Sequence, residues 1–69
     1  MDFNWIDGFA ISVKMEDNAV VLSANKEGLL SLAGHLTALA EAEGPDHFHL
    51  DQFNSLEDGS LELIVEKTE

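Results

Sequence analysis

The chain has no cysteine, no arginine and only one proline among its 69 residues. Without cysteine it can form no disulfide, no thiolate metal site and no cysteine nucleophile. Its longest apolar run, residues 19–22, is far shorter than the ~20 residues that span a bilayer. The N-terminus shows no basic region followed by an apolar stretch, as a secretory signal would. We therefore expect a cytoplasmic protein without a membrane segment.

Positive charge is also scarce. Three lysines against fourteen aspartates and glutamates give a formal net charge of −11. Nucleic acids and anionic membranes both need basic residues to hold them, so neither is expected as a partner. Residues 1–34, with five acids and two lysines, carry −3, whereas residues 35–69, with nine acids and one lysine, carry −8. Such a surface steers cationic partners toward it, although acidity also serves solubility alone.

The length allows a single small domain, residues 1–69, in which residues 1–8 are expected to be irregular. Residues 9–15 alternate between apolar and polar, and residues 19–24 form a second short strand after a polar turn, which predicts a hairpin. Asn25 is a credible N-cap for a helix that ends at Gly44-Pro45. Its apolar stripe is expected to comprise Leu29, Leu32, Ala33, Leu36, Leu39 and Ala40.

Alternation returns after the helix. Phe48 and Leu50 face one way in a third strand, and residues 61–66 form a fourth strand. The order β-β-α-β-β predicts an α+β, two-layer fold, in which one helix packs on one face of a four-stranded antiparallel sheet. We expect Trp5 to belong to the core.

The strongest candidate for metal chemistry is the strand that carries His47, His49 and Asp51. Residues i, i+2 and i+4 of a strand share a face, and two imidazoles with a carboxylate suit Zn²⁺. A closed site would need a further ligand, such as His35 or Glu62. The non-functional alternative is that these residues form the polar, solvent-exposed face of the strand. No nucleophile elbow and no phosphate-binding glycine loop is present, so we predict no enzyme and no cofactor.

The face of the sheet that the helix leaves open is a second candidate site. It is expected to carry Ser12, Lys14, His47, His49, Asp51, Glu62, Ile64 and Glu66. An apolar Ile64 inside an acidic rim is typical of a binding patch. A singly exposed isoleucine is also ordinary and needs no functional explanation.

Three stretches together resemble the immunity protein 32 family of bacterial polymorphic-toxin systems. They are residues 23–33, which open the helix, residues 47–51, with the sequence His-Phe-His-Leu-Asp, and residues 55–66. The resemblance covers residues 9–67, and its most distinctive parts are Asn25-x-x-Gly28-Leu29 with Leu32, and the histidine strand. It implies a small cytoplasmic α+β protein that protects its producer from a cognate toxin.

The sequence thus predicts an acidic immunity protein that binds and neutralises a protein toxin, such as a basic nuclease, by direct complex formation. The residues expected to bind the partner are His47, His49, Asp51, Glu57, Asp58, Glu62 and Glu66. Two alternatives stay open at this point. One is a metal-binding domain built on His47, His49 and Asp51, and the other is a homo-oligomer, such as a dimer, that pairs through the sheet face or a sheet edge.

Overall fold

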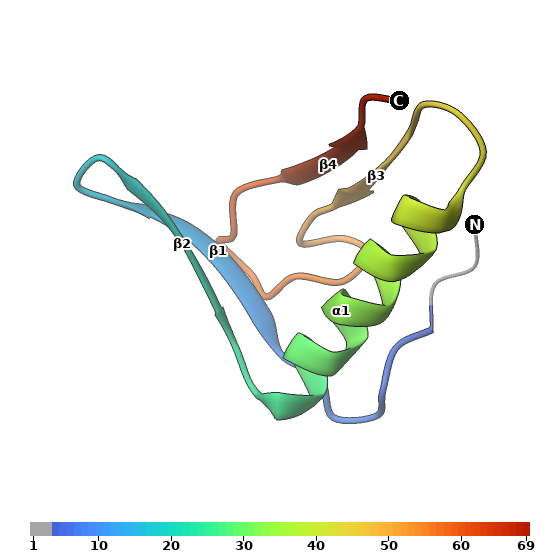
Figure 1. Cartoon of the computed structure of the whole chain (residues 1–69). Coiled ribbons are helices and arrows are strands. Elements are labelled where there is room, and N and C mark those ends of the chain that lie inside the picture. Colours follow the sequence, from blue (N-terminus) through green and yellow to red (C-terminus); the bar gives the residue numbers. More distant parts are fainter. Residues whose placement is uncertain (1–3) are drawn as a thin grey trace.

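The structure, a computed structural model, describes residues 4–69, so the expectation for residues 1–3 lies outside the described residues. Residues 4–10 contain no helix or strand. The elements follow in the expected order: β1 (Ile11–Glu16), β2 (Ala19–Ala24), α1 (Lys26–Glu41), β3 (Asp46–Leu50) and β4 (Leu63–Lys67) (Figure 1). The α+β class is confirmed.

The prediction of one four-stranded sheet is wrong. The four strands form two separate two-stranded antiparallel sheets, β1 with β2 and β3 with β4. The segment that leads to β4 lies along β1, but it does not pair with β1 as a regular strand would. It therefore does not join the two sheets into one. The backbone N–H of Glu57 donates to the carbonyl of Ile11 at 2.9 Å, and that of Leu61 donates to the carbonyl of Val13 at 2.8 Å.

The reason for the split lies in the geometry of this contact. Three residues lie between Glu57 and Leu61, but only one lies between their acceptors on β1, Ile11 and Val13, so the chain must bulge there. The bulge is a turn, closed by a 3.1 Å bond from the Ser60 N–H to the Glu57 carbonyl, with Gly59 at φ 84°. The Ser60 hydroxyl, not a backbone carbonyl, accepts the N–H of Val13 at 3.2 Å. A regular strand pairing with β1 is therefore interrupted.

Asn25 caps α1, as its sequence position predicts. Its side-chain oxygen accepts the N–H of Gly28 at 2.8 Å and that of Ala10 at 3.0 Å, while its amide nitrogen donates to the carbonyl of Gly8 at 2.8 Å. A normal N-cap satisfies only the free N–H groups of its own helix. This one also fastens the segment before β1 to the start of the helix.

The buried face of α1 differs from the predicted leucine stripe. The helix buries Gly28, Ser31, His35 and Leu39, whereas Leu29 and Leu36 are about half exposed and Leu32 is half-buried. Residues 4–9 explain the shift, because they cover the polar positions of the helix. The N–H of Ile6 donates to the Ser31 hydroxyl at 2.9 Å, and the ring of Trp5 contacts that of His35.

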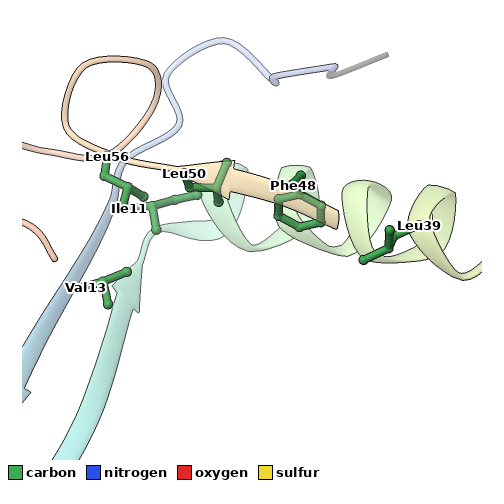
Figure 2. Packing of buried hydrophobic residues seen from close by; sticks show 6 residues of the cluster. All are labelled: Ile11, Val13, Leu39, Phe48, Leu50 and Leu56. Atoms are coloured by element: carbon green, nitrogen blue, oxygen red, sulfur yellow. The ribbon is translucent and has the colours of Figure 1, made fainter. Parts of the chain in front are cut away.

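The core lies between the helix and the inner faces of the strands. Its buried apolar members are Ile11, Val13, Leu39, Phe48, Leu50 and Leu56 (Figure 2). Trp5 is half-buried and packs against this cluster, stacked on Phe9 with ring centroids 4.5 Å apart, in agreement with its predicted core role.

Lys67 fixes β4 to the far end of the helix. Its ammonium donates to the carbonyl of Ala40 at 3.1 Å and also to that of Ala42. These are orphan carbonyls of a helix C-terminus, where the helix dipole favours a cation. Because Asp46 pairs with Lys67, this contact also holds the start of β3, and with it the second sheet, in place.

Candidate protein-binding surface

The outer face of the β3–β4 sheet gathers most of the predicted site. In the antiparallel register His47 lies opposite Glu66, and His49 lies opposite Ile64. All four side chains are exposed, and that of Ile64 has 55% of its area in contact with solvent. Directly opposed residues share a face, whereas Phe48 and Leu50, which alternate with the histidines, point into the core. The two histidines, Ile64 and Glu66 therefore form one surface.

His49 and Glu62 are in direct contact on this surface. The distance between His49 Nδ1 and Glu62 Oε2 is 3.1 Å, with about half of each side chain exposed. The contact is an ion pair only when the histidine is protonated. The ring of His47 lies edge-on to that of His49, with centroids 4.9 Å apart. These contacts orient both imidazoles while leaving them open to a partner. We call the set His47, His49, Glu62, Ile64 and Glu66 the acidic face.

Asp51 does not join this face. It follows β3, is half-buried, and its carboxylate accepts the backbone N–H groups of Phe53 at 2.9 Å and Asn54 at 3.1 Å. Its carbonyl accepts the N–H groups of Asn54, Ser55 and Leu56. These bonds are those of an Asx turn, a structural role for which aspartate is well suited.

Glu57 and Asp58 lie in the loop between β3 and β4, where both are exposed. The two acids stand at the turn that contacts β1, next to Gly59, whose N–H donates to the Gln52 side chain at 3.0 Å. They thus belong to a loop outside the paired strands and are separate from the acidic face in local structure.

The metal hypothesis gains no support from the geometry. Within residues 4–69 no three or more histidine, aspartate or glutamate side chains are placed to hold a metal ion. His35, suggested as a further ligand, is buried under the Trp5 ring at a centroid distance of 4.2 Å, on the core side of the sheet. His47 and His49 are on the outer side, so His35 cannot complete a site with them.

His35 itself is a structural histidine. Burial lowers its pKa from the ordinary value of 6.5, and a backbone hydrogen bond with Asn4 partly opposes the shift. Its ring also lies 6.0 Å from that of Phe48, in an edge-on arrangement. Burial beneath these aromatic rings therefore favours the neutral imidazole. The periodicity of the helix gave no signal for this role, because the covering residues come from a distant part of the chain.

Residues 4–69 include no helix that is long and apolar enough to cross a membrane. In the comparison with known proteins, the sequence profile of the family described as Immunity protein 32 matches residues 19–68 of this chain. The chain belongs to the immunity protein 32 family, which supports an immunity function in general terms. No curated protein and no solved structure gives a significant match.

Proposed function

We propose that this protein neutralises a cognate cationic toxin in the cytoplasm of its producer, by forming a complex through the acidic face. The observation that carries the proposal is the placement of exposed Ile64 among Glu62, Glu66 and two histidines on one open strand surface. Family membership supplies the immunity role. The action is binding rather than catalysis.

The chemistry of the face fits this role. An apolar centre surrounded by charged groups is the usual anatomy of an interface, since the centre provides affinity and the rim provides orientation. With a net charge of −11, the whole chain attracts a basic protein and raises its association rate. A nuclease toxin has a basic surface because it must bind nucleic acid. Glu57, Asp58 and Asp51 are proposed as further acids that face the partner. Among them, the carboxylate of Asp51 is already hydrogen-bonded within its own turn.

The test begins with affinity capture from the producing bacterium and identification of the bound protein by mass spectrometry. The captured toxin domain is then expressed in a sensitive host with and without this protein. The proposal predicts that co-expression restores growth and that the double variant Glu62→Lys, Glu66→Lys fails to restore it. Glu16→Lys, which changes an exposed acid on β1, is the single-charge control and should protect like the wild type. Full protection by the double variant would refute the role of the acidic face.

A further inference from the structure

One continuous stretch of the chain carries no net charge. Residues 18–40 contain only Lys26 and Glu27 as charged residues, so this stretch is neutral and the net charge of −11 resides in the remainder. The neutral stretch comprises β2 and almost all of α1. A cationic partner gains no electrostatic attraction from such a surface. A second copy of the same acidic chain meets the least repulsion there.

β2 has a free edge within this neutral region. It pairs with β1 on one side only, and in the described part of the chain no strand lies along its other side. In Figure 1 the hairpin of β1 and β2 extends away from the rest of the molecule. The strand Ala-Val-Val-Leu-Ser-Ala has no lysine, glutamate or proline. Those are the residues with which native edge strands prevent pairing with another chain.

The apolar face of this hairpin continues beyond the core. Met15 lies opposite Val20, and Val13 lies opposite Leu22, so all four share a face. Val13 is buried, but Met15 and Val20 are 58% and 61% exposed. The end of the hairpin therefore presents to solvent the same face that packs into the core at its base.

We propose that β2 pairs antiparallel with β2 of a second copy of this chain, centred on Val21 across a two-fold axis. In this register Val20 lies opposite Leu22 of the other copy, Val21 opposes its counterpart, and Ala19 opposes Ser23. No two like charges meet, and the exposed Val20 gains an apolar cross-strand neighbour. Four strands, two from each copy, then form one sheet. The proposal is independent of toxin binding and leaves the acidic face free.

The size and charge of this interface predict how the dimer behaves. Five paired residues bury less than the ~1,600 Å² of a standard interface, so the association is weak and depends on protein concentration. Two chains of charge −11 repel each other, and salt screens that repulsion. Raising the salt concentration should therefore strengthen the dimer. The same change should weaken a complex with a cationic toxin.

Cross-linking tests the register directly, because the chain has no native cysteine. In Val21→Cys the two thiols lie on directly opposed residues, whose Cα atoms are about 4.5–5.5 Å apart. That separation is within the range that a disulfide spans. In the control Ser23→Cys the two thiols are offset by four residues, about 13 Å, which is too far. Mild oxidation should give a covalent dimer of the first variant at least about tenfold faster than of the second. Equal rates, or none in either, would overturn the register.

Sedimentation velocity over about a hundredfold range of concentration, at low and high salt, tests the dimer itself. The wild type should shift toward the dimer with concentration and with salt. Val20→Lys places a charge on the interface and should remain monomeric. Ile64→Lys makes the same change at a similarly exposed strand position of the other sheet and should dimerise like the wild type. A monomeric wild type under all conditions would refute the proposal, as would a dimer that only Ile64→Lys disrupts.

Discussion

The close approach of α1 to β1 at Gly28 leads to a sharp prediction about two glycines of one helix. A Cβ on Gly28 would lie 2.7 Å from the backbone oxygen of Ala10 and 2.9 Å from Cγ1 of Ile11. A Cβ on Gly34 would point into open space, with no neighbouring atom within 4 Å. The two positions therefore differ in the space around them, although both belong to α1, Gly28 in its first turn and Gly34 in its interior.

The expected magnitudes follow from this difference. Alanine is favoured over glycine by about 0.5–1 kcal/mol in a helix interior, which Gly34→Ala should gain in full. Gly28→Ala gains no more than this and overfills a packed site, at a cost of about 1–3 kcal/mol. The obstructing oxygen is a backbone carbonyl that also accepts the Asn25 N–H, so it cannot move without straining the cap. We expect Gly28→Ala to be less stable than wild type by about 1–2 kcal/mol.

Thermal and urea unfolding of the two variants measure this contrast. The difference in unfolding free energy between them, about 1.5–3 kcal/mol, should appear as a difference of about 6–24 °C in Tm for a domain of this size. Gly34→Ala is the matched control, because it makes the same chemical change in the same helix. If Gly28→Ala were as stable as Gly34→Ala, the packing of the helix start against residues 10 and 11 would be wrong.

Three further predictions concern the helix and its surroundings. Burial lowers the pKa of His35 in the folded state, so the unfolded chain binds a proton more readily at this histidine. The contribution of His35 to the free energy of unfolding should therefore be fully present above about pH 6.5 and decrease as the pH falls below that value. The unfolding free energy of His35→Leu, measured from pH 5 to 8, should lack this component, whereas that of His47→Leu should retain it. Asn25→Ala removes three hydrogen bonds and should cost about 2 kcal/mol in urea unfolding, more than an ordinary cap; a loss below about 0.5 kcal/mol would contradict the bridging role. Lys67→Met should cost about 1 kcal/mol and increase amide exchange in the last turn of α1, and unchanged exchange would contradict its contact with the helix end.

Local patterns in the sequence predicted the elements well. Alternation over residues 9–15 and 19–24 identified the hairpin, and Asn25 marked the start of the helix. The helix ends at Glu41, three residues before the predicted stop at Gly44-Pro45. The prediction of which side of β3 faces the core was also correct, because Phe48 and Leu50 alternate with two histidines. Each of these signals depends only on neighbours in the chain.

The errors arose where distant segments decide the outcome. Between residues 28 and 40 the helix has no charged residue, so periodicity could not distinguish its buried face from an exposed apolar one. Trp5 and Ile6 cover the polar positions His35 and Ser31, and nothing local indicates that contact. The split of the sheet likewise depends on the turn at Gly59, whose contact with β1 spans more than 40 residues.

The site was predictable in part. Alternation placed His47, His49, Glu62, Ile64 and Glu66 on one outer face, and the structure brings them together. Asp51 was assigned to that face because it continues the same spacing, but the strand ends at Leu50 and the carboxylate closes the next turn. A spacing rule holds only as far as the strand itself continues.

The affinity of the purified protein for the captured toxin, measured by stopped-flow and surface binding at two salt concentrations, tests the central claim most directly. We predict that Glu62→Gln with Glu66→Gln lowers the association rate several-fold at low salt and that this difference shrinks at high salt. Ile64→Ala should raise the dissociation rate about tenfold or more, as loss of a central apolar contact does. The control Glu16→Gln should change neither rate. Rates that stay at wild-type values in the Glu62, Glu66 and Ile64 variants would show that the toxin binds elsewhere and would contradict the role of the acidic face.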